Sequence, residues 1–208
     1  MEGAMWGIYR VSNWIMKFAY VNFLWMLFTI VGLFVFGFFP ATIAMFSIIR
    51  KWIMKEVDIP IFKTFWVAYK TNFVKSNVLG LIIIFIGVVL YVDLRVIAQF
   101  RDTWVYIFYY LLLIVSLLYS LTLLYVIPVY IHYEMKPIQV LKVSFLFMIL
   151  NPFSTISMSA GLLAILFLIG QFPGLTPFFS GSLISFVIMF FAYYAFRKND
   201  FKLQKNNI

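Results

Sequence analysis

The chain has 208 residues, of which 65% are hydrophobic and only 11% are charged. So few charged groups cannot cover a soluble surface, and there is no cysteine, so a soluble enzyme, a disordered tail and a disulfide scaffold are excluded. The net charge of +9 would indicate nucleic acid in a soluble protein. Here the bases lie mostly between apolar runs, where they indicate membrane orientation and anionic lipid headgroups rather than nucleic acid.

Uncharged runs of about 20 residues, the length that crosses a bilayer, predict five transmembrane helices. The first run, residues 18–49, is too long for one crossing, and we expect Pro40 to end the first helix at Phe39. Alternatively, Pro40 marks a hairpin and residues 41–54 return across the membrane, which gives six crossings. The remaining helices are expected at residues 76–98, 103–131, 153–170 and 178–196.

The bases are concentrated in three segments, residues 50–75, residues 136–142 and the C-terminal tail. By the positive-inside rule these segments face the cytoplasm. The sequence therefore predicts an all-α, polytopic bundle in the plasma membrane with a cytoplasmic C-terminus. Five crossings would place the N-terminus outside, and six would place both termini inside.

Residues 61–73 predict an additional amphipathic helix, because their apolar side chains recur at three- and four-residue spacing while the lysines turn elsewhere. We expect it to lie in the cytoplasmic interface, with its rings at the acyl boundary and its lysines toward anionic headgroups. A docking helix for a partner protein is the alternative. The candidate interaction residues are Arg50, Lys51, Phe62, Lys63, Trp66, Tyr69 and Lys70.

The chain is expected to form one transmembrane domain, residues 1–208, with a weak internal repeat. Residues 18–98 and 103–171 share an order of parts, in which a long helix with a proline precedes an acid, a second proline, a short helix and another span. A final helix, residues 178–196, follows. Any two membrane hairpins would share such an order, so both readings stay open.

Four charges gather at the predicted outer boundary, namely Asp93, Arg95, Arg101 and Asp102. Charges inside a membrane usually mark function, but at its boundary a hydrated loop with local ion pairs explains them better. His132 is expected at the surface, because one histidine cannot form a metal site alone. No catalytic motif is visible, so we expect neither enzymatic activity nor a cofactor.

Several short motifs are distinctive, namely Asn13-Trp14, FPATIAMF at 39–46, RKW at 50–52, DIPIFKTFW at 58–66, YKTNF at 69–73 and NVLG at 77–80. These motifs resemble those of the YesL-like family of small bacterial integral membrane proteins. The resemblance covers most of the chain and is densest between residues 10 and 95.

The resemblance implies a plasma-membrane protein of Firmicutes type whose genes often lie beside carbohydrate uptake systems and their sensor kinases. It implies no mechanism and no site residue. We therefore expect an accessory protein of carbohydrate uptake or sensing, whose partners are permease subunits or a sensor kinase. A small carrier of sugars or other neutral solutes is the alternative, since Ser116, Ser120 and Thr122 could line a polar path.

Overall fold

The computed structural model describes the backbone of residues 2–100, 103–133 and 135–206, and this part of the chain is helical apart from short connections. It contains seven α-helices and one 3₁₀ turn. In chain order they are α1 (Glu2–Val31), α2 (Val35–Ile53), α3 (Ile61–Ile97), α4 (Thr103–Tyr133), α5 (Pro137–Leu150), α6 (Pro152–Gln171), η1 (Pro173–Leu175) and α7 (Thr176–Asn206).

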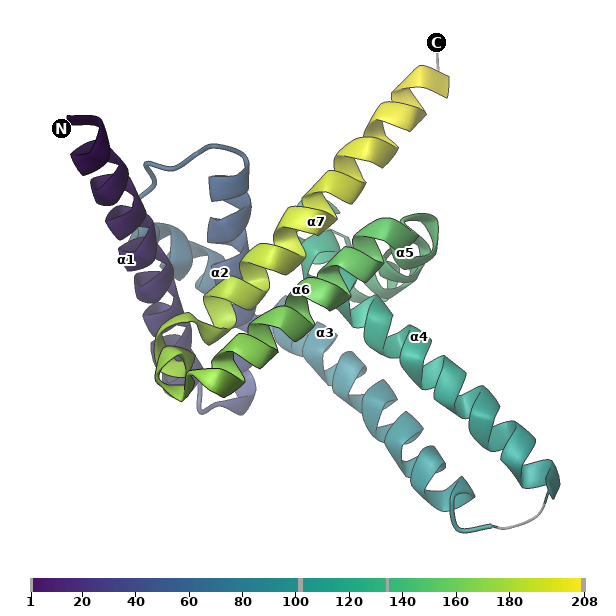
Figure 1. Cartoon of the computed structure of the whole chain (residues 1–208). Helices are drawn as coiled ribbons and strands as arrows, with labels where there is room; N and C mark the ends of the chain where they lie inside the picture. The colour runs from purple at the N-terminus through teal and green to yellow at the C-terminus, as the bar shows by residue number, and fades with distance from the viewer. Residues whose placement is uncertain (1, 101–102, 134, 207–208) are drawn as a thin grey trace.

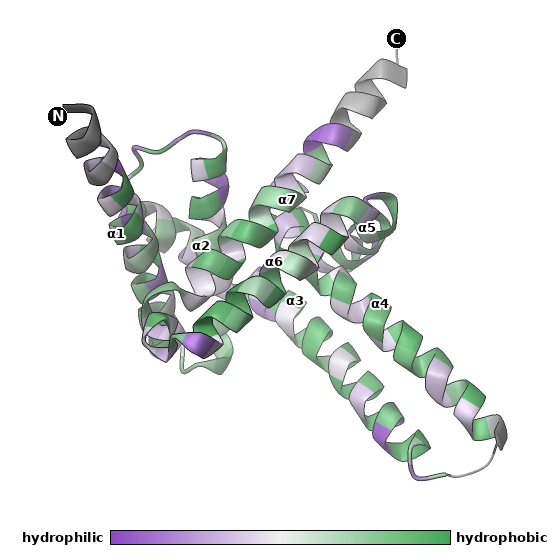
Figure 2. Ribbon diagram, in the orientation of Figure 1, coloured by the Kyte–Doolittle hydropathy of each residue, from purple (hydrophilic) through white to green (hydrophobic). Residues whose placement is uncertain are grey.

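Six helices in the described ranges are long and apolar enough to cross a bilayer, whereas α5 is shorter. The predicted polytopic helical bundle is therefore confirmed, with the alternative count of six candidate spans in place of five. Figure 2 shows hydrophobic residues along most of the length of these helices, and many of the large ones are exposed, as expected for helices surrounded by lipid.

The first break in the chain lies at residues 32–34, and the prediction that Pro40 ends the first helix is wrong. Leu33 and Phe34 have positive φ angles of 56° and 61°, which turn the chain back on itself. A Cβ on Gly32 would collide with the Cα of Gly37, so two glycines allow the close approach at this turn. Without a proline or a charge, this turn carried no strong breaker signal in the sequence.

Pro40 lies inside α2, where the helix tolerates it because a side chain supplies the missing hydrogen-bond donor. Proline has no N–H, so the carbonyl of Phe36, four residues earlier, loses its usual partner. The Nδ2 of Asn77 on α3 donates to this carbonyl at 3.0 Å. A contact between two helices thus replaces a bond within one helix.

The amphipathic segment at residues 61–73 and the span predicted at residues 76–98 form one helix, α3, of 37 residues. The separate interfacial helix predicted from the sequence is therefore absent from this part of the described chain. Lysine, serine and asparagine at residues 75–77 are compatible with a helix, so nothing ends it there. The predicted internal repeat stays a prediction. In the structure α3 is one continuous helix, whereas the corresponding part of the second unit is divided between α5 and α6.

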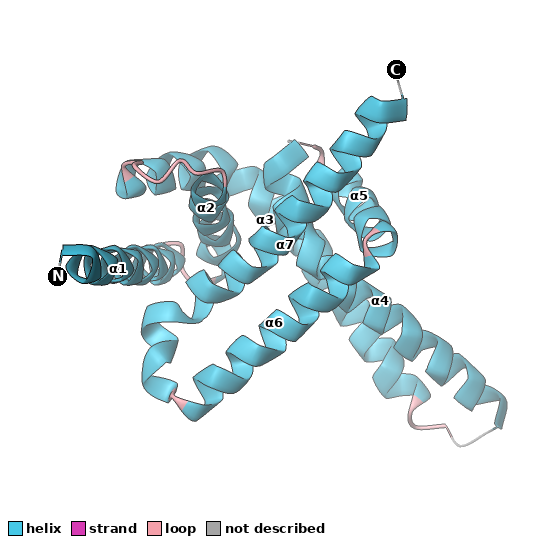
Figure 3. Ribbon diagram, turned by 45° about the horizontal axis from the view of Figure 1, so that its top comes forward, coloured by secondary structure: helices cyan, strands magenta, loops and turns pink. Residues whose placement is uncertain are grey.

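The helices form two hydrophobic clusters that meet at α7. Ile188 and Met189 belong to a cluster with α1, α2 and the first turns of α3, whereas Ala192 and Phe196 belong to a cluster with α4 and α5. Figures 1 and 3 show the α3–α4 hairpin extending away from α1 and α2, and α6 returning beside α7. Ile43 of α2 and Leu79 of α3 also belong to the second cluster, so α2, α3 and α7 each connect the two clusters.

The N-terminal end of α1 and the C-terminal ends of α2 and α7 lie toward the same side of the molecule (Figure 1). The α1–α2 turn, the α3–α4 connection and η1 lie toward the opposite side. This arrangement is the one that six crossings require.

Candidate functional site

The seven predicted interaction residues lie in two different environments. Arg50, near the end of α2, is half-buried, and its Nη2 lies 3.4 Å from the Nδ1 of His132 on α4. Since a guanidinium only donates, this ring nitrogen is the acceptor. Beside it, Lys51 forms a long ion pair with Glu56, with 3.8 Å between the Nζ and Oε2 atoms.

The aromatic members of the set surround Phe28 of α1, at the other end of the α1–α2 hairpin. Phe62, Trp66 and Tyr69 have ring centroids 5.0 to 6.3 Å from that of Phe28. Tyr69 is only 6% exposed, and its hydroxyl donates to the carbonyl of Phe28 at 3.3 Å. Phe65, one turn before Tyr69, is 0% exposed. This side of the predicted amphipathic helix is therefore buried against protein instead of facing acyl chains.

A second side of the same helix is exposed and combines rings with positive charge. Phe62 is 51% exposed and Trp66 42% exposed, and the ammonium of Lys70 lies 5.9 Å from the Trp66 ring centroid. We call this surface the basic-aromatic face of α3; it consists of Phe62, Lys63, Trp66, Val67 and Lys70, all exposed. It retains the part of the predicted interaction site that a partner could reach.

The predicted outer charge cluster is only partly described, because Arg101 and Asp102 lie outside the described residues. Asp93 and Arg95 are exposed near the end of α3. Arg95 donates its Nε–H to the hydroxyl of Tyr91 at 3.0 Å and lies over that ring, one turn earlier. These contacts match a hydrated helix end better than a buried site.

Two of the family-like motifs interlock between α2 and α3. The ring of Phe39 covers Gly80 so closely that a Cβ on Gly80 would collide with it. Beside this contact, Asn77 completes the hydrogen bonding that Pro40 leaves open, as described above. The residues that carry much of the resemblance therefore hold these two helices together.

Asn22 is a buried polar residue that the sequence analysis missed. It is 0% exposed on α1, and its amide binds the backbone of α7. Its Nδ2 donates to the carbonyl of Pro177 at 2.8 Å, while its Oδ1 accepts the N–H groups of Gly181 and Ser182, each at 3.0 Å. An asparagine inside an uncharged run is a signal that could have been read, because buried amides in membranes need partners.

The hydroxyls proposed for a polar path bond mainly to their own helix. Ser120 donates to the carbonyl of Ser116 at 2.9 Å, and Thr122 donates to that of Leu118 at 2.7 Å. Ser116 has a buried hydroxyl for which the described structure provides no partner. In the described part of the chain, no group of three or more His, Asp and Glu side chains could hold a metal ion.

These features define a polytopic α-helical membrane protein in which side-chain amides such as those of Asn22 and Asn77 connect different helices. Comparison with known proteins identifies the family. The chain belongs to the YesL-like family: it is 36% identical to YesL of Bacillus subtilis (strain 168) over 200 residues, which cover 96% of this chain and 94% of YesL. The family described as "Protein of unknown function, DUF624" matches residues 18–94.

Two further relatives from the same organism match over similar lengths. YteU is 40% identical over 192 residues, 92% of this chain and 86% of YteU. YesV is 34% identical over 193 residues, 93% of each chain. All three relatives are described as uncharacterized proteins. No solved structure gives a significant match to the chain.

Proposed function

We propose that the chain is a membrane accessory protein of carbohydrate uptake or sensing, without catalytic activity of its own. The observation that carries this proposal is the basic-aromatic face of α3. Large exposed rings are typical of surfaces that bind other proteins, in which aromatic residues carry much of the affinity. The carbohydrate context comes from the gene neighbourhood that the family resemblance implies.

The internal polar groups favour an accessory protein over the alternative, a carrier of neutral solutes. A carrier needs hydroxyls or amides that are available to its solute. The amides of Asn22 and Asn77 bind helix backbone, as do the hydroxyls of Ser120 and Thr122. Ser116, whose hydroxyl is buried without a partner in the described structure, is the remaining support for a carrier.

Co-purification tests the proposal. The full chain is purified in mild detergent, and permease subunits of carbohydrate uptake systems and sensor kinases are sought among the proteins that accompany it. Replacing Trp66 and Lys70 together with alanine should lower the recovered partner by about tenfold, the effect of removing an interaction hot spot, while the amount in the membrane stays unchanged. The matched control replaces Asp93 and Arg95, an exposed pair on the same helix, and should leave recovery unchanged.

Transport by the purified protein provides the opposing test. An accessory protein alone, reconstituted in liposomes, should not move sugars across the bilayer. Saturable sugar uptake that disappears on replacing Ser116 and Ser120 with alanine would contradict the proposal and make the chain a carrier.

A further inference from the structure

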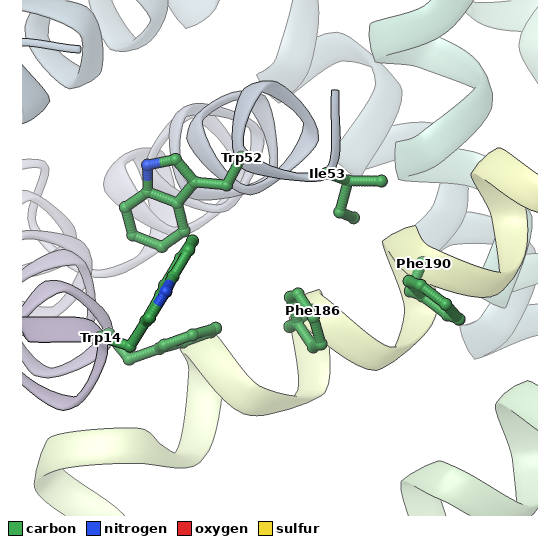
Figure 4. Close-up of a pocket in the computed structure, with 6 residues that line it drawn as sticks. Trp14, Trp52, Ile53, Phe186 and Phe190 are labelled. Atoms are coloured by element: carbon green, nitrogen blue, oxygen red, sulfur yellow. The ribbon is translucent and has the colours of Figure 1, made fainter. Parts of the chain in front are cut away.

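An aromatic pocket lies between α1, α2 and α7, away from the basic-aromatic face of α3. It has a volume of about 260 Å³ and is lined by Trp14, Phe18, Trp52, Ile53, Phe186 and Phe190. Figure 4 shows these side chains surrounding the pocket from all three helices. Trp52 forms edge contacts with Trp14 and Phe18, each with 5.5 Å between ring centroids, so the wall on this side is continuous.

The pocket lies within segments that can cross the membrane and opens at their surface. All its lining residues belong to the candidate spans Tyr9–Val31, Val35–Ile53 and Pro173–Lys198. Phe190 is exposed, and Trp14, Ile53 and Phe186 are half-buried. Aromatic and aliphatic side chains that open toward lipid provide a surface for hydrocarbon.

Basic residues lie toward one end of the pocket on α1 and α7. On α7, seven residues make about two turns, so Arg197 shares a face with Phe190 about 10 Å closer to the C-terminus. On α1, Arg10 lies about one turn before Trp14. Arg10 and Arg197 are both exposed.

These bases lie on one side of the aromatic walls, because the N-terminal end of α1 and the C-terminal ends of α2 and α7 point the same way (Figure 1). Tryptophans next to basic residues at the end of a membrane span are typical of the boundary between acyl chains and headgroups. Basic pockets between membrane helices bind anionic lipid headgroups. The apolar hollow and the charges beside it therefore match the two ends of one lipid molecule.

We propose that this pocket binds an anionic phospholipid, with an acyl chain between Trp14, Trp52 and Phe186 and the phosphate beside Arg197. A transmembrane helix of a partner is about 10 Å wide and would need a long groove, whereas an acyl chain is narrow enough to enter among six side chains. The site is independent of the proposed accessory function, because it shares no residue with the basic-aromatic face of α3.

Quenching of tryptophan fluorescence by brominated acyl chains tests this site in the full-length protein. The protein is reconstituted in phosphatidylcholine vesicles that contain a small fraction of phosphatidylglycerol, and bromine is placed on the chains of one lipid or the other. At equal mole fraction, brominated phosphatidylglycerol should quench more strongly than brominated phosphatidylcholine. The excess should disappear when Trp14 and Trp52 are both replaced with phenylalanine, which keeps aromatic walls but removes the reporters.

Matched variants separate a specific site from general surface charge. Arg197→Gln should weaken the preference for phosphatidylglycerol by about fivefold, the contribution of one base near a membrane surface. The control Lys198→Gln removes the neighbouring charge, which points about 100° away around α7, and should retain the preference. Ile53→Phe, which fills the hollow, should lower the quenching by both lipids; if this variant does not fold, the comparison of Arg197→Gln with Lys198→Gln still decides.

Three results would overturn the inference. Equal quenching by the two lipids would mean that the pocket has no headgroup preference. Equal losses in Arg197→Gln and Lys198→Gln would mean that the preference is a property of the whole surface. Pocket tryptophans that neither lipid quenches would mean that protein, such as a second copy of the chain, covers the pocket.

Discussion

Asn22 and Asn77 each place a side-chain amide against the backbone of another helix. The amide of Asn22 joins the carbonyl of Pro177 to the N–H of Gly181, two groups that would bond to each other in a regular α-helix. The amide of Asn77 satisfies the carbonyl left without a donor by Pro40. At Pro40 the side chain compensates for a carbonyl that the apolar surroundings would otherwise leave unpaired.

The sequence could indicate that such residues matter but could not identify their partners. An asparagine within an apolar run needs a hydrogen-bonding partner, and this inference requires only the chain itself. The partner of Asn22 lies 155 residues later, at Pro177. Helix packing alone brings these two residues together, and one sequence without a structure carries no record of that distance.

The pairing of Asn77 with Pro40 predicts that their substitutions are coupled. Asn77→Leu should lower the free energy of unfolding by about 1 kcal/mol, the typical size of a hydrogen bond between membrane helices. In a Pro40→Ala background the helix regains a donor for the Phe36 carbonyl, so the same Asn77→Leu change should cost clearly less. Unfolding of the four proteins in detergent gives this double-mutant cycle. Additive costs would contradict the proposed compensation.

Helices were predicted correctly where the length of the uncharged run and the helix-breaking residues indicated the same boundaries. The break at residues 171–177 was predicted and corresponds to η1, and the helix predicted at 153–170 corresponds to α6. The break at residues 32–34 was missed because its positive φ angles occur at Leu33 and Phe34, residues that do not favour turns. The reading of Pro40 as a helix end failed because Asn77 supplies the missing hydrogen bond, a tertiary contact that overrides local preference.

The amphipathic pattern of residues 61–73 was real, but its cause was misassigned. Phe65 and Tyr69 are periodic because they are buried against other helices, whereas Phe62 and Trp66 contact Phe28 on one side and are exposed on the other. Periodicity reports that one face differs from another and does not distinguish lipid from protein as its neighbour. The candidate interaction site stays a prediction; the structure shows that its rings and lysines at Phe62, Lys63, Trp66 and Lys70 are exposed and that Tyr69 is buried.

The contact between Phe39 and Gly80 fixes the crossing of α2 and α3 and predicts a steric effect. Gly80→Ala should lower the free energy of unfolding by about 1 to 3 kcal/mol, because the new methyl overlaps the Phe39 ring and forces the helices apart. Gly170→Ala is the matched control, since a Cβ there would meet nothing within 4 Å. Thermal unfolding in detergent measures both, and Phe39→Leu should recover part of the loss. Equal stability of the two alanine variants would show that the ring moves aside without cost.

At the scale of the whole molecule, six crossings strengthen the charge asymmetry that the sequence shows. With both termini on one side, Arg10 and Lys17 join the bases of the α2–α3 loop, the α4–α5 loop and the tail. The opposite side then holds Arg95 near the end of α3. Under the positive-inside rule this distribution predicts that both termini face the cytoplasm.

Cysteine labelling in intact cells tests the six-crossing account most directly, because the chain has no cysteine of its own. Single cysteines replace Gly7 on α1, Gly174 in η1 and Lys198 on α7, all exposed positions. A membrane-impermeant thiol reagent should label position 174 and leave positions 7 and 198 unlabelled until the membrane is permeabilised. Labelling of position 7 together with 174, while 198 stays protected, would place the termini on opposite sides and contradict six crossings.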